Sequence, residues 1–174
     1  MAPQSTATTV AREEAGGIGT AVYTDGMLAG VAGGLAIALW FLVIDAASGR
    51  PFYTPTVLGT AVFQGAAGPV DLGAIRPSLE VVLPFTWLHL LVFATIGVVA
   101  SRLLAVAERN PNYGFGVLLF FVIFEIGFVA VCLVLAEQVL HALAWPAVLI
   151  GNLLAAAAMA AVLWRRHPNL RVLP

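Results

Sequence analysis

Long apolar stretches alternate with short polar ones along this chain of 174 residues. Four stretches carry at most one charged residue each, at about residues 27–47, 82–107, 113–136 and 146–164. An α-helix of about 20 residues crosses about 30 Å of hydrocarbon, so each stretch is long enough to span a membrane. The pattern predicts an all-α integral membrane protein, in which a bundle of four transmembrane helices forms a single membrane domain over residues 25–166.

The residues between and around these stretches predict two tails and one long loop. Residues 1–24 are rich in alanine, threonine and glycine, and we expect a flexible tail there, with a second short tail at residues 167–174. The loop, residues 48–81, contains Thr54 and Pro55, an N-cap residue followed by proline at the first helical position. We therefore expect a short helix lying in the membrane interface, with an irregular capping loop as the alternative.

The composition strengthens the membrane interpretation. Hydrophobic residues make up 61% of the chain and charged residues only 10%, whereas a soluble domain carries about 25% charged residues. All eight basic residues are arginines spread along the whole chain, so no basic face for nucleic acid is expected. The single cysteine, Cys132, excludes an intrachain disulfide and a Cys-x-x-Cys redox pair. The first expected partner is therefore the lipid bilayer.

The arginines are distributed unequally between the two sides that these helices create. Only Arg50 and Arg76 lie on the side of the long loop. Six fall on the opposite side: Arg12, Arg102, Arg109, Arg165, Arg166 and Arg171. Arginine and lysine are more frequent on the cytoplasmic side of membrane helices. We therefore expect both termini in the cytoplasm and the loop outside, in the inner (plasma) membrane of a bacterial cell.

Small residues recur at every fourth position in the first and last apolar stretches. The first carries Gly26, Gly30 and Gly34, and the last carries Gly151 and Ala155. Apolar side chains gain little by leaving lipid for another helix, so membrane helices associate where small residues let their backbones approach. We expect the first and fourth helices to meet along these two ladders. A homodimer contact along the same residues is the alternative.

Three polar residues lie well inside the apolar stretches: His89, Glu125 and Asn152. A charged carboxylate at the bilayer centre costs roughly 2.5–3.5 kcal/mol to insert, so such residues need partners and are candidates for function. His89 and Asn152 fall at similar depths. Gly97 shares the helix face of His89, so we expect this face to pack inward. We expect the three polar residues to form one interior cluster. The cluster would either carry protons or ions, or hold the helices together by hydrogen bonds.

Four further polar residues are expected near the outer surface. Asp45 is placed to pair with Arg50 and fix the external loop. Glu137 and His141 are one turn apart if the third helix continues past residue 136, in the order that favours an ion pair. For all four residues a structural role is favoured over catalysis.

The spacing of the histidines and acids gives no pattern for a cofactor. A haem held by two histidines needs both imidazoles in one cavity, whereas His89 and His141 belong to different helices and different expected depths. The paired Glu-x-x-His motifs of di-metal bundles and the His-Glu-x-x-His motif are missing from the sequence. We therefore predict no metal ligands and no bound cofactor.

These features favour a non-enzymatic protein. The leading hypothesis is an accessory or scaffolding component of a membrane assembly, whose partners are other membrane subunits or further copies of the chain. One alternative is a small proton- or ion-coupled transporter that uses His89, Glu125 and Asn152. A second alternative is a redox or lipid-modifying enzyme with its site near the outer surface.

Overall fold

The computed structural model describes residues 4–64, 76–109, 122, 123, 126 and 145–166. Four helices have defined bounds within this part of the chain, and no strand occurs in it: α1 (Gln4–Ala47), α2 (Tyr53–Gln64), α3 (Leu79–Arg109) and α6 (Trp145–Arg166). Three helical stretches are long and apolar enough to cross a membrane: Thr20–Ala47, Leu79–Glu108 and Pro146–Arg166. The chain is therefore a helical membrane protein. All but three residues of the expected third span, 113–136, lie outside the described residues.

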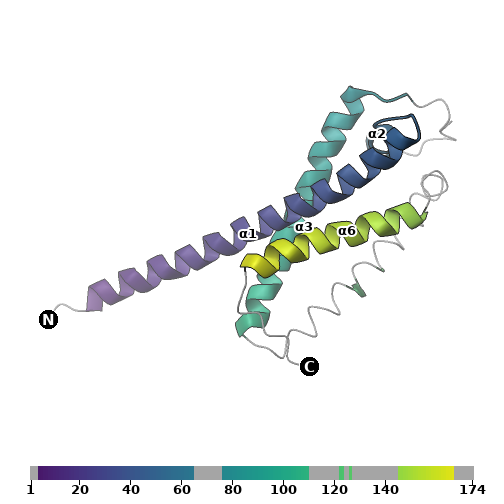
Figure 1. Ribbon diagram of the computed structural model, residues 1–174. Helices are drawn as coiled ribbons and strands as arrows, with labels where there is room; N and C mark the ends of the chain where they lie inside the picture. The colour runs from purple at the N-terminus through teal and green to yellow at the C-terminus, as the bar shows by residue number, and fades with distance from the viewer. Residues whose placement is uncertain (1–3, 65–75, 110–121, 124–125, 127–144, 167–174) are drawn as a thin grey trace.

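Helix α1 is much longer than the first apolar stretch. It runs without interruption from Gln4 to Ala47 and extends past the other helices at its N-terminal end (Figure 1). The helix therefore includes most of the tail expected over residues 1–24, and the flexibility of that tail stays a prediction. The physical reason for the longer helix lies in helix propagation: adding a residue to an existing helix is far easier than starting one, and alanine, glutamate, arginine and glutamine favour it.

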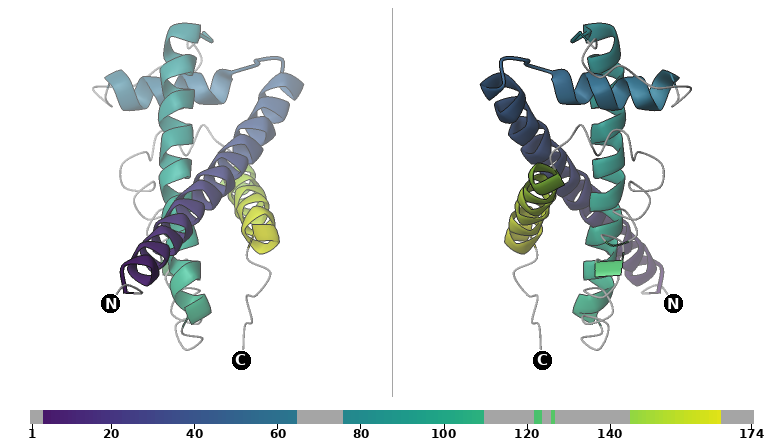
Figure 2. Two further views of the ribbon diagram at one scale, coloured as in Figure 1. Left: turned by 90° about the vertical axis from the view of Figure 1, so that its left-hand side faces the viewer. Right: turned by 90° about the vertical axis from the view of Figure 1, so that its right-hand side faces the viewer.

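The helices are arranged around α1. It contacts α2, α3 and α6, and α2 also contacts α3. Figure 2 shows α1 crossing α3 at a steep angle, with α6 on another side of α1 and α2 lying transverse to α3 near one end of the bundle. Helix α1 is thus the element that holds the described helices together.

Glycines make the crossing between α1 and α3 a contact of backbone against backbone. A Cβ added at Gly30 would collide with the carbonyl of Phe93 and lie 2.6 Å from the Cα of Ala94. A Cβ at Gly97 would collide with the carbonyl of Gly26 and lie 2.5 Å from the Gly30 nitrogen. Only residues without a Cβ allow this approach, which increases dispersion contacts along the crossing.

The partner of the α1 ladder therefore differs from the prediction. Gly26, Gly30 and Gly34 lie against α3, whereas the sequence had suggested the fourth helix. Helix α6 does meet α1, but on the neighbouring face, where a Cβ at Gly33 would lie 2.6 Å from the Met159 side chain. Its own small residues, Gly151 and Ala155, do face α1. A four-residue ladder identifies a close contact, but it does not identify the partner helix.

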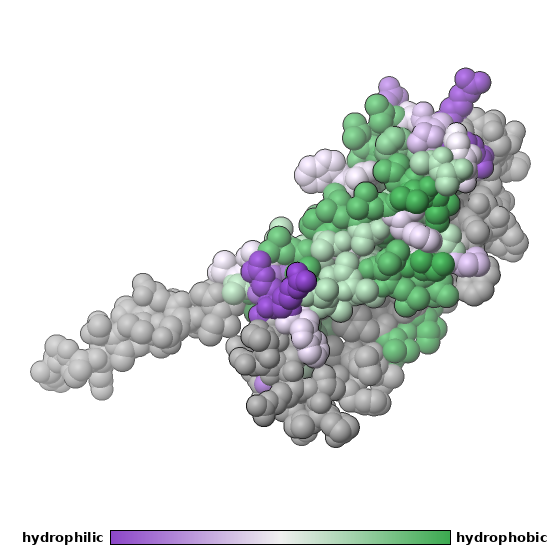
Figure 3. All heavy atoms as spheres, in the orientation of Figure 1, coloured by the Kyte–Doolittle hydropathy of each residue, from purple (hydrophilic) through white to green (hydrophobic). Residues whose placement is uncertain are grey.

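The buried apolar core is small and lies where α1, α3 and α6 come together. Ala29, Ala100 and Leu163 are buried there, and Leu104 and Val162 pack against them. On the face drawn in Figure 3, apolar residues cover the middle of the coloured part and hydrophilic residues lie toward its two ends. Large apolar side chains such as Trp87, Leu91 and Leu153 are exposed. This distribution is the one that a bilayer, rather than water, solvates.

Candidate functional site

Hydrogen bonds hold the corner between α1 and α2 at one end of the bundle. Gly49 ends α1 in the left-handed region, at φ +70°. The N–H of Gly49 donates to the carbonyl of Ala46 at 3.0 Å, and the N–H of Arg50 donates to the carbonyl of Asp45 at 2.9 Å. These two bonds form a Schellman motif, which satisfies carbonyls that a helix end leaves without partners.

The Asp45 side chain then binds the start of α2. Its two carboxylate oxygens accept hydrogen bonds from the Thr54 backbone N–H and the Thr54 hydroxyl, each at 2.7 Å. Both Asp45 and Thr54 are buried, at 4% exposure. A carboxylate at a helix N-terminus accepts from N–H groups that lack partners and interacts favourably with the helix dipole. Asp45 therefore fixes α2 to the end of α1.

Two predicted details of this corner have a different form in the structure. The expected partner of Asp45 was Arg50, but the Arg50 guanidinium lies over the Tyr53 ring, 4.2 Å from its centroid. Thr54 was expected as the N-cap of the loop helix, but it lies inside the first turn of α2, and the capping carboxylate comes from α1. A local capping motif could not reveal this, because the carboxylate stands nine residues earlier in the chain.

Backbone strain accompanies the corner. Phe52 has φ +64°, which costs an ordinary residue about 1–2 kcal/mol. Its carbonyl accepts hydrogen bonds from the Thr56 N–H at 3.2 Å and the Thr56 hydroxyl at 2.7 Å. Thr56 and Val57 are almost completely buried. The bonds of Asp45 and Thr56 together offset the strain, so the direction of α2 is set by the surrounding contacts.

His89 joins α3 to α1 inside the apolar region. Its Nε2 lies 3.2 Å from the carbonyl oxygen of Gly34, and the ring is half-buried. Phe85 and Phe93, one turn away on either side, place their rings 6.0 Å and 4.7 Å from the imidazole. As expected, the face that carries His89 and Gly97 lies against α1. The imidazole therefore contacts the backbone of α1 and packs between two phenylalanines of its own helix.

The other members of the predicted interior cluster are placed only in part. Asn152 is half-buried on α6 and is not without a polar partner. Its neighbour Gly151 faces Ile37 and Trp40 of α1, about one turn from where His89 meets Gly34. Glu125 lies outside the described residues, as do Glu137 and His141. His89 thus meets α1 at Gly34, and Asn152 follows a residue of α6 that meets α1 about one turn away.

Another side chain, on α1, bonds to a backbone carbonyl of α6. The sequence analysis did not predict this contact. The Trp40 indole N–H donates to the backbone carbonyl of Ala147 at 2.8 Å. The residue one turn after Ala147 is Gly151, whose missing side chain leaves room for the indole. The sequence did contain a signal, because a tryptophan inside an apolar helix needs an acceptor for its N–H when it is buried.

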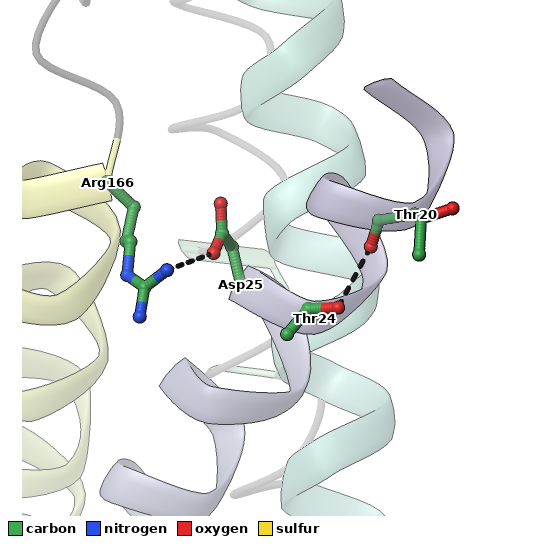
Figure 4. A network of polar contacts seen from close by, with 4 residues as sticks. All are labelled: Thr20, Thr24, Asp25 and Arg166. Carbon is green, nitrogen blue, oxygen red and sulfur yellow. Dashed lines mark hydrogen bonds and ion pairs between the residues drawn. The ribbon is translucent and has the colours of Figure 1, made fainter. Parts of the chain in front are cut away.

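The opposite end of the bundle has its own polar contacts. Arg166, at the end of α6, donates from Nη1 to the Asp25 carboxylate of α1 at 3.0 Å (Figure 4). Thr24 donates to the Thr20 carbonyl of its own helix at 3.0 Å. The Arg102 guanidinium of α3 lies over Tyr23 of α1, 4.3 Å from the ring centroid. Ionic and aromatic contacts therefore join both α3 and α6 to α1 at this end.

Comparison with known proteins adds no family to this description: no family model, no curated protein and no solved structure matches the chain. Within the described residues, no three His, Cys, Asp or Glu side chains come together in a way that would hold a metal ion. Asp45, Trp40, His89 and Arg166 each form a hydrogen bond to a neighbouring helix, whereas the hydroxyls of Thr24, Thr86 and Thr95 bond within their own helices. The candidate site is therefore this set of interhelical contacts around α1.

Proposed function

We propose that this protein is an accessory or scaffolding subunit of a larger membrane assembly, with α1 as its central helix. The observation that carries the proposal is the direction of the polar side chains in the apolar region. His89 of α3 and Trp40 of α1 each bond to a backbone carbonyl of the neighbouring helix. Such bonds fix helices relative to one another, which suits a subunit whose role is to present a defined surface.

The surface available for partners is large and apolar. On α3, Leu83 and Trp87 are 59% and 77% exposed, and on α6 Leu153 is 62% exposed. Helix α1 also extends past the bundle at its N-terminal end. Contiguous apolar faces and a projecting helix are typical of subunits that associate through their helices.

The placement of the helix ends supports a fourth crossing by residues 110–144, as the sequence suggests. The end of α3 lies near the start of the α1 span, because Arg102 stacks on Tyr23. The start of α6 lies at the other end, because Ala147 accepts from Trp40. We therefore propose that residues 110–144 cross the membrane once more between α3 and α6. Four crossings place both termini on one side, and the arginine distribution favours the cytoplasmic side of a bacterial inner membrane.

A labelling experiment tests this topology. In a Cys132→Ser background, the variants Asn110→Cys and Ala142→Cys should react with a membrane-impermeant maleimide from opposite sides of oriented vesicles. Labelling of both cysteines from the same side would contradict the fourth crossing.

The assembly role is tested by the mass of the protein in its own membrane. Extraction of the full chain with a lipid-retaining polymer, followed by light scattering, should give a particle of fixed stoichiometry that contains more than one polypeptide. In the Cys132→Ser background, Leu153→Cys on the exposed face of α6 should crosslink to that second polypeptide, whereas the buried control Ile37→Cys should not. A particle with one chain and lipid alone would contradict the proposal.

A further inference from the structure

The exposed face of α3 has the shape of a binding track for a lipid. Leu88, Val92, Thr95 and Val99 follow one another at spacings of three and four residues, and all four are exposed. Positions at this spacing lie on one face of a helix. Arg102 is the next residue on the same face and is also exposed. An apolar stripe therefore runs along α3 and ends at a guanidinium.

The polar group within the stripe does not interrupt its apolar character. The Thr95 hydroxyl donates to the Leu91 carbonyl of its own helix at 2.9 Å, so it needs no acceptor from the surroundings. The hydrocarbon-facing surface of the stripe is then formed by the aliphatic groups of leucine, valine and threonine. This is a surface along which an acyl chain can lie.

The position of Arg102 along α3 is that of a lipid headgroup. Residues 81–101 contain no charged residue, and Glu80 and Arg102 stand on either side of them. At 1.5 Å per residue these positions span about 30 Å, which is the thickness of the hydrocarbon region. The guanidinium therefore lies at the level where phosphodiester groups are found.

The contact with Tyr23 orients the guanidinium for an anion. The guanidinium lies over the ring, 4.3 Å from its centroid. Stacking uses one face of the guanidinium and leaves its N–H groups pointing outward in the plane, which is the geometry that binds phosphate oxygens. The nearby carboxylate of Asp25 is already paired with Arg166 and only 13% exposed, so its repulsion of an anion is reduced.

We propose that this face binds one anionic phospholipid, with its phosphodiester on Arg102 and an acyl chain along the stripe from Val99 to Leu88. Charge selects the occupant, because a zwitterionic lipid offers the same acyl chains without net attraction for the arginine. The same phosphate chemistry would also fit inorganic phosphate. The apolar stripe distinguishes the two sources, since it contributes only to the binding of a lipid.

Native mass spectrometry of the full chain in detergent, with phosphatidylglycerol and phosphatidylcholine titrated separately, tests the site. The wild-type chain should retain phosphatidylglycerol in preference to phosphatidylcholine. Arg102→Gln should weaken that retention about fivefold, the effect of removing one arginine near a charged headgroup. Arg102→Lys keeps the charge but loses the stacked, planar donor set, and it should fall between the two.

The chain offers a matched control at the opposite end of the bundle. Arg50 also lies over a tyrosine, at 4.2 Å from the Tyr53 centroid, so Arg50→Gln removes an equal charge and an equal stack. It should leave the retention of phosphatidylglycerol unchanged. Equal retention in Arg102→Gln and wild type would overturn the proposal, as would an equal loss in Arg50→Gln. Competition by inorganic phosphate would assign a phosphate site instead of a lipid site, and a change in oligomer mass alone would assign a protein contact.

Discussion

Helix α1 meets its two long neighbours in different ways. Against α3, backbone touches backbone, with Gly26 and Gly30 opposite Gly97. Against α6, side chains fill the space: Met159 lies over Gly33, and Ile37 and Trp40 lie over Gly151. The sequence shows the same feature at both contacts, a glycine at helical spacing. A glycine in a membrane helix therefore permits either a close backbone crossing or space for a larger side chain of the neighbouring helix.

The largest expected effect comes from filling the crossing with α3. Gly30→Leu places a side chain where the Phe93 carbonyl and the Ala94 Cα already lie. Because backbone atoms cannot move aside as a side chain does, we expect a loss of about 3 kcal/mol of stability. Thermal unfolding in detergent measures it. Gly34→Leu is the control, since its neighbours are the Leu90 and Phe93 side chains, and it should lower stability less. Equal losses would contradict a backbone crossing at Gly30.

The next effect concerns the contact of α1 with α2, which depends on hydrogen bonds and not on close approach. Asp45→Ala removes the acceptor of two bonds to Thr54 and leaves a buried N–H without a partner. We expect α2 to lose about 2 kcal/mol of local stability. Hydrogen exchange of the α2 amides measures this loss. Ser48→Ala, which removes an exposed bond to the Ile44 carbonyl, should leave α2 exchange unchanged. Unchanged protection in Asp45→Ala would show that packing alone holds α2.

A smaller effect is expected from removing the side-chain hydrogen bonds that join α1 to α6 and to α3. Trp40→Phe removes the N–H that bonds to the Ala147 carbonyl but keeps most of the ring. His89→Phe does the same for the bond to the Gly34 carbonyl. Interhelical hydrogen bonds in membranes contribute about 0.6–1 kcal/mol, so both variants should unfold at slightly lower temperature. Trp87→Phe, at a site 77% exposed, is the control. A much larger loss in His89→Phe would indicate that the imidazole does more than join two helices.

The smallest effect is expected at the ion pair. Arg166→Gln removes the 3.0 Å contact with Asp25, but the arginine side chain is 51% exposed. Exposed pairs contribute about 0–1 kcal/mol, and salt screens them. Thermal unfolding at low and high ionic strength should show a small loss that disappears in salt. A loss that persists in high salt would place this pair among the main contacts of α6.

The sequence allowed the helices to be predicted better than their neighbours. The apolar stretches at 27–47, 82–107 and 146–164 are confirmed as helices long enough to cross a membrane, because length and hydropathy are local properties. The partner of the glycine ladder was predicted wrongly. Gly97 marks an inward-facing side of α3, but nothing in the local sequence identifies the Gly26–Gly30 face of α1 as its partner.

Of the polar contacts, too, some could be predicted from the sequence and others could not. The face of His89 was predicted to point inward, because a histidine within an apolar stretch and a glycine share it. The Asp45–Thr54 and Trp40–Ala147 bonds were missed, since each joins residues whose proximity depends on the turn at Gly49 or on the placement of α6. A carboxylate in a sequence identifies a group that needs partners, but the partners follow from the tertiary fold.

A comparison of Gly30→Ala with Gly33→Ala tests whether α1 and α3 touch backbone against backbone while α1 and α6 meet through side chains. Each substitution adds one methyl group and raises helix propensity by about 1 kcal/mol. At Gly33 the new Cβ meets Cγ and Sδ of the Met159 side chain, with the Ala155 carbonyl oxygen at 3.2 Å, whereas at Gly30 all the nearest atoms belong to the backbone of α3. We predict that Gly30→Ala unfolds well below the wild-type temperature and that Gly33→Ala lowers the unfolding temperature less, because the Met159 side chain can rotate. Equal shifts in the two variants would contradict a backbone crossing at Gly30.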